Sequence, residues 1–182
     1  MRYTTGNILD YIGRAGAICI TTNGFTKSNG EAVMGRGIAK QMADRYPYLP
    51  KLLGNAIRDN GNIIQELGVI TKTKIISFPV KPISIRASAN LSNEVVSHAV
   101  KQYKAGDMVP GFHCKADVNI ITESIMDLVA LTKAKPIYVV LPILGCGAGE
   151  LSFNKDGIRE KMESNLNDFF YCMSFNKVDF TK

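Results

Sequence analysis

The sequence predicts an α/β protein, a three-layer α/β/α sandwich around a central mixed sheet. Short apolar runs rich in β-branched residues alternate along the chain with segments whose apolar residues recur at helical spacing. Hydrophobic residues make up 46 % of the 182 residues and charged residues 21 %, which is typical of a globular chain with a buried core. This length suits one domain, and we therefore expect a single domain over residues 1–182.

The first third of the chain has one clear strand and two clear helices. Residues 17–22 are apolar and β-rich, and the turn dipeptide Asn23-Gly24 ends them, so they predict a buried strand that leads into a loop. Helices are predicted over residues 37–46, which precede Pro47, and over residues 49–59.

The middle of the chain begins with two strands and then loses its periodicity. Residues 62–71 and 74–80 alternate and are rich in Ile and Val, so they are expected to pair as neighbouring strands. Residues 82–115 predict an insertion folded over the domain surface, with a short helix around residues 93–103.

The last third returns to alternating elements. Helices are predicted over residues 117–131 and 154–170, and strands over residues 137–141 and 171–175. The second of these strands is expected to close the sheet.

Composition excludes several classes of protein. No apolar run approaches the ~20 residues of a membrane span, and no signal-peptide core follows Met1, so we expect a cytoplasmic protein without a membrane partner. The net charge of +6 is spread along the chain and does not predict a nucleic-acid groove. No metal and no cofactor are expected. The adjacent pair His113-Cys114 is a weak metal motif. The four cysteines form no CxxC pair and are expected to be reduced; they are Cys19, Cys114, Cys146 and Cys172.

Two glycine-rich loops predict a site for phosphate. Gly145, Gly147 and Gly149 lie between a predicted buried strand and a predicted helix, where backbone N–H groups and the positive end of the helix can face an anion. Taken alone, this loop is equally well explained as a tight turn without a ligand. A second loop, residues 30–40, also follows a strand and opens a helix, so the two loops are expected to form two walls of one cleft suited to a diphosphate. Arg36 is either a phosphate contact or a solvated side chain.

These motifs resemble those of the macrodomain family. The resemblance rests on Gly6-Asn7-Ile8-Leu9, on Thr21-Thr22-Asn23-Gly24, on the run from Met34 to Ala39, and on Leu141-Pro142 followed by Gly145-Cys146-Gly147. It covers nearly the whole chain except residues 82–113. The chain is most similar to the subgroup that holds terminal ADP-ribose protein glycohydrolase and the DarG antitoxin, which removes ADP-ribose from thymidine in DNA. Similar stand-alone macrodomains occur in phage and bacterial genomes.

The resemblance implies ADP-ribose binding and assigns ligand-binding residues. Asn7 and Ile8 fall where the family recognises adenine, usually through an acidic side chain, so Asn7 is a departure. The residues expected beside the distal ribose are Thr22, Asn23, Gly35, Arg36, Gly37, Ile38 and Ala39. The residues expected around the diphosphate are Gly145, Cys146, Gly147, Ala148, Gly149 and Glu150.

Lys81 and Glu150 are the implied catalytic residues. Lys81 follows a predicted strand where the subgroup carries a lysine that attacks the anomeric carbon of the ribose, and this chemistry requires an unprotonated amine. The alternative is a solvated lysine that ends a strand. The subgroup's catalytic aspartate is replaced here by Gly149, and the adjacent Glu150 either substitutes for it or faces solvent.

Three functions remain open at this point. The first is an ADP-ribosyl hydrolase, or glycohydrolase, that reverses ADP-ribosylation of DNA or protein and acts as a monomer. The second is a non-catalytic module that binds ADP-ribose or a related nucleotide signal, and the third is an ADP-ribose 1''-phosphate phosphatase. A Rossmann dinucleotide domain is disfavoured because no GxGxxG turn follows the first strand.

Overall fold

The computed structural model describes residues 1–133 and 136–174, and it contains a six-stranded mixed sheet. The strands lie in the order β1 (Arg2–Thr5), β8 (Phe170–Ser174), β7 (Val139–Pro142), β2 (Ala17–Asn23), β4 (Thr73–Lys81) and β3 (Gln65–Ile70). Neighbouring strands are parallel except for β3 and β4, which pair antiparallel. The sequence predicted that these two strands are neighbours but not their direction.

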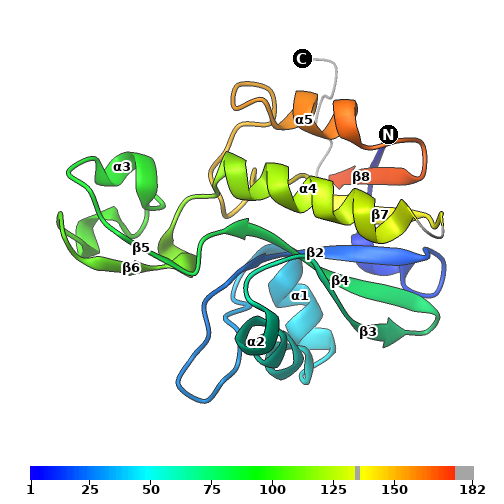
Figure 1. Ribbon diagram of the computed structural model, residues 1–182, viewed down its shortest axis with the longest axis horizontal. Coiled ribbons are helices and arrows are strands. Elements are labelled where there is room, and N and C mark those ends of the chain that lie inside the picture. The colour runs from blue at the N-terminus through cyan, green and yellow to red at the C-terminus, as the bar shows by residue number, and fades with distance from the viewer. Residues whose placement is uncertain (134–135, 175–182) are drawn as a thin grey trace.

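Helices cover both faces of the sheet, which makes the predicted three-layer sandwich (Figure 1). On one face lie α1 (Gly37–Arg45) and α2 (Leu49–Asn60), and on the other lie α4 (Val118–Lys133) and α5 (Ile158–Asn165). Strands β2 and β4 are almost entirely buried because apolar side chains from both layers pack against them. No helix within residues 1–133 and 136–174 is long and apolar enough to cross a membrane.

Several predicted boundaries are wrong. The helix predicted over residues 154–170 is only α5, because residues 152–157 form turns and the chain becomes extended again at Leu166. The helix predicted around residues 93–103 is replaced by two single turns, α3 (Leu91–Glu94) and a 3-10 turn, η2 (Val100–Gln102).

Other elements were missed or displaced. Strand β1 and the 3-10 turn η1 (Ile8–Tyr11) were not predicted, and β3 begins at Gln65 rather than at residue 62. Strand β8 (Phe170–Ser174) contains residues 171–174 of the predicted closing strand, and Phe175 lies outside the described residues. This strand does not close the sheet, because β1 pairs with its other side and forms the edge.

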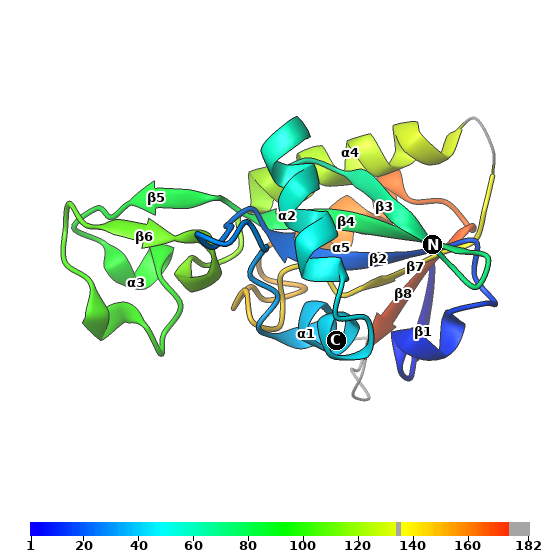
Figure 2. The ribbon, with the colours of Figure 1, turned by 90° about the horizontal axis from the view of Figure 1, so that it is seen from below.

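Residues 82–115 do not fold over the domain surface, as predicted, but form a lobe that projects from one end of the sheet (Figure 2). The lobe contains the antiparallel hairpin of β5 (Ser84–Arg86) and β6 (Met108–Pro110), the turns α3 and η2, and a further 3-10 turn, η3 (Gly111–His113). It has a small core of its own, made of Ala87, Val95, Val96, Ala99, Val109 and Cys114. The lobe leaves the sheet directly after β4 and returns just before α4, so it lies beside the end of β4 that carries Lys81.

Candidate functional site

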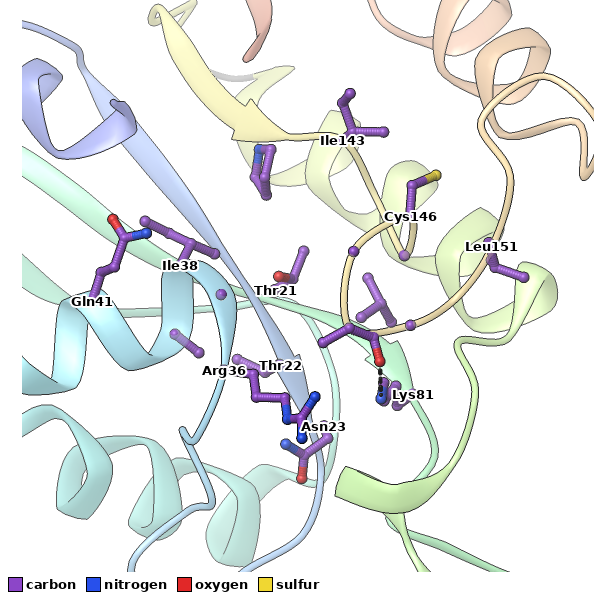
Figure 3. A pocket seen from close by; sticks show the side chains of 18 of the residues that line it. Thr21, Thr22, Asn23, Arg36, Ile38, Gln41, Lys81, Ile143, Cys146 and Leu151 are labelled. Atoms are coloured by element: carbon purple, nitrogen blue, oxygen red, sulfur yellow. Dashed lines mark hydrogen bonds between the residues drawn. The ribbon is translucent and has the colours of Figure 1, made fainter. Parts of the chain in front are cut away.

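A cleft of about 660 Å³ lies at the carboxyl ends of the parallel strands β2, β4, β7 and β8. This is the edge at which open α/β sheets bind ligands, because the loops that follow neighbouring strands meet there. Both predicted glycine-rich loops line the cleft, one on each side, as Figure 3 shows around Arg36 and Cys146. The sequence prediction that the two loops share one cleft is therefore correct.

The cleft brings together every predicted ligand-binding residue except Glu150. These residues are Asn7, Ile8, Thr22, Asn23, Gly35, Arg36, Gly37, Ile38, Ala39, Gly145, Cys146, Gly147, Ala148 and Gly149, and Lys81 lies among them. Further lining residues that the sequence did not predict include Thr21, Val33, Gln41, Val80, His98, Phe112, His113, Ile143, Leu151 and Phe153.

The loop after β7 lines the cleft and has backbone N–H groups without acceptors among the described residues. Within the described part of the chain, no acceptor takes the N–H groups of residues 146–149. The carbonyl groups on the same stretch are engaged instead: the Ala148 carbonyl accepts from Lys81, and the Gly149 carbonyl accepts from the Ala116 N–H at 2.9 Å. A loop that fixes its carbonyls and leaves its N–H groups unpaired is suited to an anion such as phosphate.

Gly149 is required by packing. A Cβ atom at this position would collide with the carbonyl oxygen of Gly145 and approach the side chain of Ala116 to 2.6 Å. Gly145 itself has a φ of +71°, in the left-handed region that favours glycine. The backbone of this loop therefore excludes an aspartate at residue 149. By contrast, nothing lies within 4 Å of a Cβ built on Gly147.

The opposite wall is the loop that opens α1. Arg36 is the N-cap of α1, and the N–H groups of residues 37–39 belong to its first turn, where a helix has no internal acceptors. No other described group accepts from them. Gly35 and Gly37 leave open space where side chains would stand, so their backbone is accessible from the cleft. This wall presents the positive end of a helix together with the exposed Arg36 guanidinium.

The helix that was predicted to follow the loop after β7 does not reach the cleft. Helix α5 begins at Ile158, and none of its residues lines the cleft. The loop after β7 therefore lines the cleft without the adjoining helix that the sequence predicted. The reason is the run of turns at residues 152–157, which separates the loop from the helix.

Lys81 is the last residue of β4 and is only 7 % exposed. Its Nζ donates a hydrogen bond of 2.8 Å to the carbonyl oxygen of Ala148, drawn as a dashed line in Figure 3. Burial, with a smaller contribution from the Arg36 cation, lowers the pKa of the Lys81 amine to about 8, against opposing effects of Cys114 and Glu150. A substantial fraction of the amine is therefore unprotonated at mildly alkaline pH. The solvated lysine considered from the sequence is not what the structure contains.

Glu150 lies outside the lining of the cleft and is directed to the lobe. Its carboxylate accepts hydrogen bonds from the N–H and the hydroxyl of Ser97, at 2.7 to 3.0 Å, and its Oε2 lies 3.7 Å from Nζ of Lys115. Partial burial opposes ionisation, but the Ser97 hydrogen bonds and the Lys115 cation lower the pKa of this carboxyl overall. The side chain thus neither joins Lys81 in the cleft nor stands free in solvent, the two alternatives that the sequence left open.

Three polar side chains at the cleft have different surroundings. The Asn23 amide donates to the carbonyl of Val33 and its oxygen accepts from the Phe25 N–H, so this side chain holds the loop after β2. The Asn7 oxygen caps η1 through the N–H of Leu9. The hydroxyl of Thr22 is buried and has no hydrogen-bond partner among the described residues.

The lobe supplies a third wall, made of His98, Phe112 and His113, which we call the lobe wall. It is fixed by aromatic contacts: the rings of Phe112 and His113 lie 4.5 Å apart, and Phe25, from the loop after β2, packs edge-on against Phe112 at 5.1 Å. Two sequence signals bear on this wall: residues 82–113 follow Lys81 directly, which suggested a lid or a partner-selecting surface as an alternative to an inert insertion, and His113 adjoins Cys114. Nothing in the periodicity showed which side chains reach the cleft.

Among the described residues, the fully charged side chains that line the cleft are all cations. Arg36 and Lys81 line it, and no described lining residue is an aspartate or a glutamate. Among the residues in the described ranges, no group of His, Cys, Asp and Glu side chains is arranged to hold a metal ion. The cleft is therefore suited to an anionic organic ligand bound by backbone N–H groups and two cations.

Comparison with solved structures identifies the fold. The macrodomain of Mycobacterium tuberculosis DarG superimposes with a TM-score of 0.61 at 20 % sequence identity, covering 94 % of this chain and 95 % of that one. The macrodomain of Thermus aquaticus DarG gives a TM-score of 0.61 at 19 % identity, covering 96 % and 97 %. Thermosipho africanus DarTG, solved in complex with ADP-ribose, gives 0.58 at 16 % identity, covering 95 % of this chain and 41 % of that one.

These similarities show that the chain has the macrodomain fold, in agreement with the resemblance in its motifs. No protein-family model and no curated protein sequence matches the chain.

Proposed function

We propose that this protein binds ADP-ribose and hydrolyses ADP-ribosyl groups from modified DNA or protein, with Lys81 as the nucleophile. The observation that carries the proposal is the position of Lys81: a buried amine with a lowered pKa lines the same cleft as two glycine-rich loops whose N–H groups are unpaired.

The two loops supply the binding part of the proposal. Both loops line the cleft and have N–H groups without acceptors among the described residues, Arg36 belongs to one of them, and a diphosphate has enough oxygens to be held from both sides. The fold supports the same ligand, since Thermosipho africanus DarTG, which is similar in structure, was solved with ADP-ribose.

Lys81 supplies the chemical part. In the proposed first step the Lys81 nitrogen forms a bond to the anomeric carbon of the distal ribose, and the bond from that carbon to the carrier breaks. The electron pair of that bond leaves with the carrier, which also takes a proton from the attacking amine. The product of this step is a covalent adduct between Lys81 and ADP-ribose, which water then hydrolyses.

The test compares release of ADP-ribose by the wild type, Lys81→Ala and Lys74→Ala, from thymidine-modified DNA and from an ADP-ribosylated protein. Lys74 is a matched control because it lies on the same strand but is exposed and paired with Glu66 at 2.6 Å. Calorimetry with free ADP-ribose is measured for all three proteins.

We expect release by the wild type and by Lys74→Ala, loss of release in Lys81→Ala, and binding of ADP-ribose by all three. Binding without release from either carrier would replace the hydrolase by a binding module. If ADP-ribose did not bind at all, the proposal would fail as a whole.

A further inference from the structure

The lobe wall places a second titratable group in the cleft with Lys81. His113 lies on η3, at the point where the lobe returns to the sheet, and it lines the same cleft as the Lys81 amine. Hydrolysis of a lysine adduct needs a group that accepts a proton from water, and a neutral histidine is the side chain that most often does this near neutral pH.

The ring of His113 is held in one orientation. Its Nδ1 lies 2.7 Å from the hydroxyl of Tyr103, and the ring packs against Phe112, Tyr103 and His98 with centroid separations of 4.5, 5.8 and 5.9 Å. We assign to His113 the tautomer in which Nδ1–H donates to the hydroxyl oxygen of Tyr103, because only this tautomer leaves Nε2 unprotonated and able to accept a proton. Within the described residues, Nε2 has no hydrogen-bond partner.

The surroundings of His113 favour its neutral form. Burial is the main cause of a lowered pKa, and the groups that face the ring from neighbouring elements add to it: His98 from the lobe, Lys81 from β4 and Arg36 from the start of α1. The next residue, Cys114, is a buried neutral thiol, because burial raises its pKa to about 11. His113 can therefore accept a proton at neutral pH.

Carboxylates do not compete for this role. No described residue that lines the cleft is acidic, and Glu150, the nearest candidate from the sequence, is bound to Ser97 and Lys115. We infer that His113, oriented by Tyr103, accepts the proton of the water that releases ribose from Lys81. This inference rests on the proposed function, because it assigns the second half of that reaction.

The step balances as follows. The water oxygen forms a bond to the anomeric carbon, and the bond from that carbon to the Lys81 nitrogen breaks, returning its electron pair to the nitrogen. Nε2 of His113 takes one proton from the water, and the resulting imidazolium gives it to the departing amine. The products are ADP-ribose with a free anomeric hydroxyl, an uncharged lysine amine and a neutral His113, with no oxidant or reductant involved.

The experiment is a single-turnover assay with rapid quenching, on wild type, His113→Gln, Tyr103→Phe and Tyr138→Phe. Sodium borohydride is added at the quench, since it reduces the ring-opened imine form of the adduct, and intact mass with peptide mapping then reports ADP-ribose on Lys81. Tyr138→Phe is a control for the loss of a hydroxyl, because Tyr138 is 54 % exposed and does not line the cleft. Release is measured from pH 5 to pH 9.

We expect His113→Gln to release ADP-ribose about 10²-fold more slowly and to accumulate the Lys81 adduct, whose hydrolysis no longer depends on pH below 7. Tyr103→Phe is expected to be slowed by about tenfold and to keep that dependence with a shifted midpoint. Tyr138→Phe is expected to behave as the wild type.

Release by His113→Gln at the wild-type rate would overturn the inference and leave the proposed function standing. Slow release without an adduct and with an unchanged pH profile would also overturn it, because a merely structural role gives that pattern. If the wild type released ADP-ribose from neither carrier, the proposed function itself would be refuted, and the inference with it.

Discussion

Glu150 and Ser97 are joined by hydrogen bonds across 53 positions of sequence, with both the N–H and the hydroxyl of Ser97 donating to the carboxylate. The contact links the loop after β7 to the lobe. Glu150 adopts a φ of +60°, which is uncommon for a residue with a side chain, and the contact holds it there. The carboxylate therefore has a positioning role between two walls of the cleft.

Glu150→Ala is accordingly expected to loosen the loop while leaving the chemistry largely in place. Hydrogen bonds to a charged group contribute about 1.5–3 kcal/mol when buried, and the 27 % exposure of this side chain reduces that to about 1 kcal/mol of unfolding free energy. ADP-ribose affinity is expected to fall by about threefold, and the release rate by less than tenfold. Denaturant unfolding, calorimetry and single-turnover release measure the three effects.

Glu150→Gln provides the comparison, because its amide oxygen still accepts from Ser97. A loss of release of about 10²-fold or more in both variants, at unchanged affinity, would mean that the carboxylate reaches the reacting carbon after all.

A second prediction separates two glycines of the loop after β7. Gly149→Ala forces a methyl group against the Gly145 carbonyl, and overpacking of this kind costs about 1–3 kcal/mol. Gly147→Ala places its methyl group in open space and is expected to change the unfolding free energy by less than about 0.5 kcal/mol. Urea denaturation of the two variants tests the difference. Equal destabilisation would show that the loop does not have the backbone described here.

The parts of the fold that the sequence predicted are those with local signals. The strand that became β2 was recognisable because its residues are apolar and end at Asn23-Gly24. Strand β1 was missed because only four residues form it, and it depends on pairing with β8, whose partner residues lie 169 positions away, as between Arg2 and Tyr171.

In the candidate site, too, the residues with a local sequence pattern were predicted and those placed by long-range contacts were missed. The glycine-rich loops were predicted because glycine spacing is a local pattern, and both line the cleft. The lobe wall was missed because His98 and His113 lie far from Lys81 in sequence and reach the cleft only through the folding of the lobe. The direction of Glu150 was equally hidden, since it depends on a positive φ and on a contact with Ser97.

Arg36 tests the electrostatic part of binding. It is exposed at the start of α1 and is one of two cations that line the cleft, so a contact with phosphate there is partly screened by solvent. Arg36→Gln is expected to weaken ADP-ribose binding by about three- to tenfold and to reduce its dependence on salt. Calorimetry at low and high salt measures both. Unchanged affinity at both salt concentrations would mean that the guanidinium is solvated and does not contact phosphate, which is the alternative raised by the sequence.

The pH dependence of release above pH 7 follows from Lys81. Only the unprotonated amine attacks, and its pKa is lowered to about 8, so the rate should rise with pH and level off above that value. The unprotonated fraction grows by about tenfold from pH 7 to pH 9, and single-turnover release, corrected for spontaneous loss, should grow in proportion. His113 adds no step in this range, because its pKa lies below the ordinary histidine value.

Arg36→Gln tests whether the Lys81 amine causes this rise of the release rate with pH. The Arg36 cation helps to lower the pKa of Lys81, so its removal should raise that pKa and move the midpoint of the rate profile to higher pH. Glu150→Gln is expected to have the opposite effect. It removes an anion that raises the Lys81 pKa, so the midpoint of the rate profile should move to lower pH. A midpoint that stayed fixed in both variants would mean that the group titrating above pH 7 is not the Lys81 amine.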